Sequence, residues 1–347
     1  YHNEWFFQHM YCNKTFADWT STNFPKTSPL SGGPFGYKDF IASFTAAKWD
    51  PAAWASVFKK SGAAWVQLSA QHHDRFALWD SAVTKWDSKD MGPKRDLVGE
   101  LATAVRAQGL KFGVSNHIMY GSSFAYCGAG GTTPGNVGPN TPASVSDLYD
   151  PKYADFYGPP SAECGAKAAS TSCSPKKEFC DDWLARTKEL SEKYQLDIQW
   201  FDWDGANVEG SACMNDKLTF VRDYYKAGCA WGKEVATAGK GGVFPGDDNS
   251  ADGANIMIHD FETGGHAPAA GAEPKAFWMV DDKIGNGSWG YTAGMTYRSA
   301  ASIISQMDNY KSRGGVLVLN VSPMADGTLP QAQQDILIEI GKHLGVQ

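Results

Sequence analysis

The sequence lacks long basic runs and long apolar segments, and each absence removes a class of partner. No stretch of Lys and Arg reaches five residues, and the 347-residue chain has a formal net charge of −7. Nucleic acid and anionic membranes are therefore unfavourable partners. No apolar stretch approaches the ~18 residues of a transmembrane helix. No secretory signal peptide is recognisable at the N-terminus, although Tyr1 is not a natural start residue.

The seven cysteines lack the close pairing that zinc sites use. Cys164, Cys173 and Cys180 stand nine and seven residues apart, whereas zinc sites commonly contain Cys-x-x-Cys pairs. We therefore expect disulfides, and because seven is odd, at least one thiol is free or pairs outside the chain. Asn13 and Asn286 each begin an N-glycosylation triplet. Together these features predict a secreted glycoprotein.

The chain has the length of one α/β barrel domain, which takes roughly 250 residues or more. From residue 50 onward, short apolar strands alternate with amphipathic helices. Strands are predicted at 65–69, 110–118, 197–204, 234–239, 254–261 and 315–322. Helices are predicted at 94–109, 175–195, 217–228, 297–310 and 331–344. A Gly-, Pro- and Cys-rich insertion of about 120–174 interrupts this order and is expected to be functional or pinned by disulfides.

Alternating strands and helices imply a parallel sheet covered on both faces. An open doubly wound sheet and a (β/α)8 TIM-like barrel both fit this order. No glycine-rich phosphate fingerprint follows any strand, and several strands end in polar or aromatic residues, where a barrel holds its chemistry. The pattern favours the barrel. Only six or seven strands are countable, and the chain opens with a loop-like segment, so we expect the first barrel strand to be missing from the chain as given.

A tryptophan and two aspartates share one side of the strand 197–204. Trp200, Asp202 and Asp204 alternate along it and therefore point the same way. A carboxylate beside a tryptophan suits glycoside cleavage, because the acid attacks or stabilises the anomeric carbon while the indole packs on the sugar. A strand-end aspartate that caps the next helix is the structural alternative.

Two adjacent histidines follow the strand 65–69 in the segment AQHHDRFALWDS. They fit a metal site, a catalytic dyad or a sugar-binding surface. Adjacent residues of a strand point to opposite sides, so both can face one metal only if the backbone turns between them. A metal-dependent barrel hydrolase would take its ligands from His72, His73 and Asp202, with His117 or His259 in addition.

Five motifs, taken in order, resemble the retaining α-L-fucosidases of glycoside hydrolase family 29. They are AQHHDRFALWDS, KRDLVGEL with AVRAQGLKFGVS, WFDWDG, GSWGY and GGVLVLNVSPMADGTLP. They span essentially the whole chain, and NEWFFQHMY near the N-terminus resembles the loop after the family's first strand. The resemblance implies an exo-acting hydrolase on a (β/α)8 barrel. It would remove terminal α-L-fucose from an oligosaccharide or glycoconjugate without a cofactor.

The resemblance also implies roles for individual residues. Asp202 matches the nucleophile, with Asp204 as the fallback because Trp203 and Asp204 precede the expected glycine. The residues that match sugar contacts are Glu4, Trp5, His72, His73, Trp200 and Lys240. The histidine pair is then a sugar-binding surface that needs no metal. Lys240 stands where the family often has an arginine, so it offers a point charge instead of a planar fork.

The general acid/base is matched less closely. The loop HDFETGGHAPAAGAEPKAFW offers two glutamates, and the position that the family pattern aligns falls on Gly265. Glu262, at the strand end, is the first choice, and Glu273, deeper in the loop, is the reserve. A solvated loop glutamate is the alternative for either residue.

Two further departures concern the ends of the chain. The family's first strand and its fucose-binding histidine are not found, so we expect either a cleaved N-terminal segment that stays bound or an incomplete sequence. We also expect no C-terminal β-sandwich domain. Because a strand is missing and the glutamate is displaced, a catalytically impaired fucose-binding relative stays open as an alternative.

Overall fold

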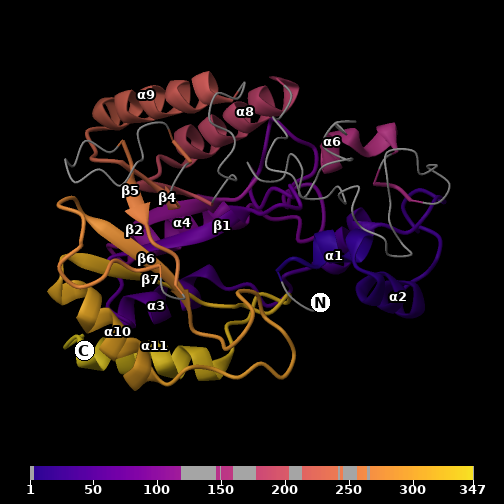
Figure 1. Cartoon of the computed structure of the whole chain (residues 1–347). Coiled ribbons are helices and arrows are strands. Elements are labelled where there is room, and N and C mark those ends of the chain that lie inside the picture. The colour runs from indigo at the N-terminus through magenta and orange to yellow at the C-terminus, as the bar shows by residue number, and fades with distance from the viewer. Residues whose placement is uncertain are drawn as a thin grey trace.

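The structure, a computed structural model, describes residues 4–118, 146–148, 150–158, 177–202, 213–240, 243–244, 256–263 and 266–346. Its strands form one sheet, in which every neighbouring pair is parallel and the spatial order follows the sequence (Figure 1). The strands are β1 (Trp65–Gln71), β2 (Lys111–Asn116), β3 (Ile198–Phe201), β4 (Ala236–Lys240), β5 (Ile258–Asp260), β6 (Trp278–Lys283) and β7 (Gly315–Asn320). The predicted strands all overlap observed ones, and β6 was not predicted.

The sheet curls, because side chains from its two ends meet in one interior cluster. Ile198, Trp200, Ala238 and Met279 are buried there, and they pack with Trp65 of β1 and with Val316 and Val318 of β7. These side chains alternate along their strands and point to the inside of the curl. Within the described residues, β1 and β7 are not paired with each other, so the sheet is a curled, open barrel. The missing first strand stays a prediction.

Helices cover the outside of the curled sheet. Their bounds are α3 (Pro51–Lys60), α4 (Leu97–Ala107), α8 (Lys177–Tyr194), α9 (Met214–Trp231), α10 (Ala300–Ser312) and α11 (Gln331–His343). α3, which precedes β1, packs on α4 and also on α11, which follows β7. Gly341 allows this second contact, because a Cβ atom there would collide with the carbonyl oxygen of Lys60. The helix layer therefore joins the two ends of the sheet.

The helix boundaries follow local sequence signals. Asp50 and Asp96 cap α3 and α4, since each side chain accepts a hydrogen bond from a backbone N–H in the first turn. Pro51 stands at the first position of α3, where its missing N–H costs nothing. Gly232 ends α9 with a φ of 66°, a left-handed conformation that glycine adopts readily.

An aromatic N-terminal region packs beside the barrel. It contains α1 (Phe6–Cys12), α2 (Lys14–Asn23), a 3₁₀ turn (Tyr37–Ser43) and, farther along the chain, a second 3₁₀ turn (Pro151–Tyr153) and α6 (Ala154–Tyr157). A buried ion pair joins its two halves, with Lys38 Nζ 2.7 Å from Asp147 Oδ2. Tyr11 and Tyr157 donate hydrogen bonds to the same carboxyl group. These bonds position the segment that carries Glu4 against the barrel.

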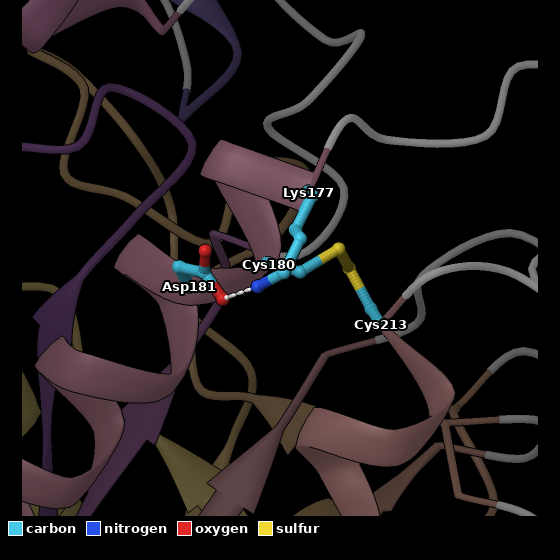
Figure 2. Close-up of a disulfide and its surroundings, with 4 residues drawn as sticks. All are labelled: Lys177, Cys180, Asp181 and Cys213. Atoms are coloured by element: carbon cyan, nitrogen blue, oxygen red, sulfur yellow. Dashed lines mark hydrogen bonds and ion pairs between the residues drawn. A yellow bond between two sulfur atoms is a disulfide. The ribbon is translucent and has the colours of Figure 1, made fainter.

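A disulfide joins Cys180 in α8 to Cys213, the residue before α9 (Figure 2). β3 lies between these two helices in the chain, so the bridge ties the segments on either side of it. A disulfide at Cys180 is thereby confirmed, and the exposed Cys229 is a free thiol, as the odd count predicted. Cys164 and Cys173 lie outside the described residues, as does most of the insertion 120–174. None of the described helices is long and apolar enough to cross a membrane.

Candidate active site

Polar side chains gather at the carboxyl ends of the central strands. Asp202 directly follows β3, Lys240 ends β4, and Asp260 ends β5, with Glu262 two residues later. Asp281 lies in β6. Because the strands are parallel, their carboxyl ends meet at one mouth of the curled sheet, which is where barrel enzymes hold their chemistry.

The ammonium group of Lys240 lies at the centre of this group. Its Nζ atom is 3.0 Å from Asp202 Oδ1, 3.2 Å from Glu262 Oε1 and 3.9 Å from Asp281 Oδ2. Burial lowers the pKa of Lys240, but the carboxyl groups of Asp202, Asp281 and Glu262 together raise it by more. The net pKa is above the ordinary value, so the side chain stays charged. A single cation therefore holds three carboxyl groups together.

Two histidines contact the other oxygen of Asp202. His117 Nδ1 lies 3.3 Å from Asp202 Oδ2, and His73 Nε2 lies 3.8 Å from the same atom. Burial alone raises the pKa of Asp202, but the contact with His117 and the charge of Lys240 lower it well below its ordinary value. The carboxyl group of Asp202 is therefore ionised at neutral pH.

The histidine pair reaches one side of the site because the backbone turns after β1. Arg75, with a φ of 64°, closes this turn by donating its N–H to the carbonyl oxygen of His72 at 2.9 Å. The rings of His72 and His73 lie 4.2 Å apart, and His72 lies 4.7 Å from His117. Burial and the neighbouring histidines lower the pKa of His72 well below its usual value, and burial lowers that of His73 to about 3. Both rings are therefore neutral at pH 7.

Two tryptophans border the cluster. Trp200 is buried, and its indole N–H donates a hydrogen bond of 2.6 Å to Asp260 Oδ2. The Lys240 ammonium lies 5.7 Å from the Trp200 ring and 5.9 Å from that of Trp289. Trp289 belongs to the GSWGY motif, and its backbone N–H donates to Glu4 Oε2 at 3.2 Å. The N-terminal loop and this motif therefore meet beside the site.

The other residues predicted for the site differ in where the structure places them. Trp5 is 43% exposed, and its ring lies 6.4 Å from that of His9. Glu273 pairs with Arg313 at 3.0 Å, on the outer side of the barrel near the end of α10. Backbone N–H groups and Arg313 lower the pKa of Glu273, whereas Glu262 lies at the mouth, 3.2 Å from the ammonium group that also contacts Asp202. The geometry thus favours Glu262 over Glu273. Asp204 and Gly265 lie outside the described residues.

The sequence did not predict that three residues, named below, belong to this cluster. His117 was considered only as a metal ligand, yet it contacts Asp202 and also Ser115, whose hydroxyl lies 2.9 Å from its Nε2. Asp260 and Asp281 were not considered. The strand-end rule that identified Asp202 would have found Asp260, whereas Asp281 required β6 to be recognised.

The positive charge of the site comes from a lysine. Across the described ranges, no group of three or more His, Cys, Asp or Glu side chains is arranged to hold a metal ion. The Lys240 ammonium occupies the position between the carboxylates that a cation would otherwise take. The arrangement places a positive charge directly beside a candidate carboxylate nucleophile.

The chain is similar to α-L-fucosidases in sequence and in structure. A family model described as alpha-L-fucosidase matches residues 1–347. Tissue alpha-L-fucosidase of Rattus norvegicus is 27% identical over 351 residues, which cover 99% of this chain and 63% of that protein. The corresponding protein of Bos taurus is 25% identical over 362 residues, covering 99% and 62%.

The solved structures to which this chain is similar are also those of α-fucosidases. One alpha-L-fucosidase superposes with a TM-score of 0.67 at 26% identity, covering 99% of this chain and 64% of that one. The alpha-fucosidase of Thermotoga maritima in complex with fucose gives a TM-score of 0.65 at 26% identity, covering 99% and 65%. The chain thus spans less than two thirds of the length of these relatives.

Proposed function

The chain belongs to the α-L-fucosidase family, and from this premise we propose that it is an exo-acting, retaining glycoside hydrolase that removes terminal α-L-fucose from glycans. The observation that carries the proposal is the ionised Asp202 at the mouth of the curled sheet, held by Lys240 and His117. A relative that binds fucose without hydrolysing it would share the pocket, so turnover decides between the two.

Asp202 is proposed as the nucleophile. Its carboxylate attacks the anomeric carbon, so the bond from that carbon to the leaving oxygen breaks while a bond to Asp202 forms. Ionisation at neutral pH suits this role, because a carboxylate is a much stronger nucleophile than a protonated carboxylic acid. The contacts with His117 and Lys240 supply that ionisation and fix the orientation of the carboxyl group.

Glu262 is proposed as the general acid/base. It would protonate the departing oxygen in the first step and take a proton from the attacking water in the second. Its side chain is 42% exposed at the mouth, where a leaving group departs and water arrives. Both carboxyl groups contact the same nitrogen, at 3.0 and 3.2 Å. A retaining mechanism requires the two groups to stand about 5–5.5 Å apart.

The surrounding residues are proposed to bind the sugar. His72 and His73, being neutral, can each donate and accept a hydrogen bond with sugar hydroxyl groups. Trp200 provides an apolar wall, and Glu4 and Trp5 are expected to approach the sugar from the N-terminal loop. Lys240 holds the carboxylates together in addition to any contact with the sugar.

We also propose that the protein is secreted and that a further strand completes the barrel. The Cys180–Cys213 disulfide fits an oxidising compartment, and both Asn13 and Asn286 are exposed, as glycosylation requires. The outer edges of β1 and β7 are unpaired in the described part of the sheet, although α3 and α11 beside them are in contact. A bound segment that carries the first strand would pair with both edges.

The test is hydrolysis of an aryl α-L-fucoside by the full chain and by Asp202→Asn. The amide keeps the shape of the side chain but is not a nucleophile, so we expect at least a thousandfold loss of kcat/KM. Asp308→Asn, on the outer face of α10, is the matched control and should retain full activity. Tight fucose binding by a wild-type protein that shows no turnover would instead establish a fucose-binding relative.

A further inference from the structure

The cluster around Lys240 contains one more carboxyl group than the proposed mechanism uses. Asp281 points to the inside of the curled sheet, beside the segment that follows β5 and carries Glu262, and Thr263 N donates to the carbonyl oxygen of Asp281 at 3.1 Å. The Asp281 carboxyl is buried, and its Oδ2 is 3.9 Å from Lys240 Nζ. Its Oδ1 atom is buried without a hydrogen-bond partner among the described residues. A buried polar atom of this kind in an open site calls for a partner that arrives with the ligand.

The neighbouring carboxyl group explains the state of Asp281. Asp260 accepts two hydrogen bonds, 2.6 Å from the indole of Trp200 and 2.8 Å from the backbone N–H of Asp281. Asp281 receives no such bonds from the described residues, and two adjacent buried carboxylates repel each other. Of this pair, Asp260 is therefore more stable in its ionised form, and Asp281 is the carboxyl group that carries the proton.

The other groups around Asp281 also favour its protonated form. In the part of the chain that the structure describes, Lys240 of β4 is the cation that pairs with Asp281, at 3.9 Å, and it is shared with Asp202 and Glu262. Lys283, two residues farther along β6, lies over the Trp289 ring at 4.9 Å, and β7 places the apolar Val318 opposite Asp281. Burial, followed by the charge of Asp260, raises the pKa of Asp281 to about 8.

We propose that Asp281 is a third functional carboxyl of this site, which stays protonated at neutral pH and donates a hydrogen bond to an oxygen of the bound sugar. The inference rests on the proposed function and deepens it. A buried carboxylic acid can be kept neutral in order to donate in this way. No proton is transferred from Asp281. When it loses its proton at alkaline pH, the donor is lost and a further negative charge faces the ammonium of Lys240, so substrate binding weakens.

The test compares the pH dependence of kcat/KM for an aryl α-L-fucoside in the wild type, Asp281→Asn and Asp282→Asn. Asparagine remains a neutral donor at every pH, so Asp281→Asn should keep activity within about tenfold near pH 6. It should also lose the alkaline decline that the wild type shows above about pH 8. Asp282 is the matched control, because it points outward to Arg298 and Gln306 and should leave the profile unchanged.

Infrared difference spectroscopy provides a readout that does not need activity. The carbonyl band of a protonated carboxylic acid should be present at pH 7 in the wild type and in Asp282→Asn, and absent in Asp281→Asn. An unchanged alkaline limb in active Asp281→Asn, or its complete inactivity near pH 6 with a native fold, would overturn the inference. A wild type that hydrolyses no fucoside at any pH would instead contradict the proposed function, and the infrared band would still report the proton on Asp281.

Discussion

A single ammonium group organises the chemistry of this site at the scale of residues. Lys240 contacts Asp202 and Glu262 at similar distances, and Asp281 lies slightly farther away. Burial favours the protonated form of Asp202, and the contact with His117 and the charge of Lys240 oppose this effect. The lysine thus acts with His117 to keep the proposed nucleophile ionised, and its one point charge reaches several oxygens at once.

Replacing Lys240 with methionine should shift the acidic limb of the pH profile. Lys240 lowers the pKa of Asp202 in the folded protein, so its removal raises that pKa. Asp202 would then become protonated as pH falls, at a higher pH than in the wild type, and kcat/KM should decline earlier on the acidic side. The measurement is the pH dependence of fucoside hydrolysis. Lys240→Arg, which keeps the charge, should restore the acidic limb, and an unshifted limb in Lys240→Met would contradict this role.

At the scale of elements, the strand that carries Asp202 is fixed from both sides. β3 is short, and Asp202 directly follows it. The Cys180–Cys213 disulfide connects α8, before β3, to the start of α9, after it. This bridge closes a loop with a sequence separation of 33 residues that contains the proposed nucleophile.

Removal of this bridge should destabilise the protein. For a loop of this length, the chain-entropy model gives about 3–4 kcal/mol of lost stability at room temperature. The measurement is the free energy of unfolding of the double variant Cys180→Ser, Cys213→Ser by chemical denaturation. Cys229→Ser removes an exposed free thiol and should leave stability unchanged. Equal stability of the double variant and the wild type would show that the bridge does not constrain this region.

The parts of the site that the sequence predicted lie at the ends of recognisable strands. The apolar strand before AQHHDRFALWDS and the alternating WFDWD pattern placed the histidines and Asp202 at one mouth. Lys240 followed from a match to the family pattern, whereas Glu262 was chosen for its place at a strand end, because the aligned position falls on Gly265. Asp281 was missed because WMVDDK contains two adjacent aspartates, which interrupt the apolar run by which a buried strand is recognised. The role of His117 depends on a contact with β3, and no local pattern encodes such a contact.

At the scale of the whole molecule, the helix layer stabilises the curl of an incompletely paired sheet. α11 and α3 come from the two ends of the barrel segment and pack against each other, and Trp54 donates its indole N–H to the carbonyl oxygen of Gly327 at 2.9 Å. Lys48 N also donates to Asp326 O at 2.6 Å. These contacts join the regions beside β1 and β7 although the two strands are not paired.

The close approach of α11 to α3 can be tested at Gly341. In Gly341→Ala the added methyl group meets the carbonyl oxygen of Lys60, so the two helices must separate. We expect a loss of about 1–3 kcal/mol, the usual range for overpacking, in the free energy of unfolding. Gly33→Ala is the matched control, since its Cβ would make only an ordinary contact of 3.5 Å with Ser31 Oγ. Full stability of Gly341→Ala would show that this helix contact does not hold the curl.

In the proposed mechanism Asp202 forms a covalent bond to fucose, and mass spectrometry of the enzyme during turnover measures this bond directly. A fluorinated fucosyl donor with a good leaving group slows the second step, so that the intermediate accumulates. We expect one fucosyl residue per chain, located by peptide mapping on the segment that contains Asp202 and absent in Asp202→Asn. Turnover of the same donor by wild-type enzyme without label on that segment, or with label on another carboxylate, would contradict it.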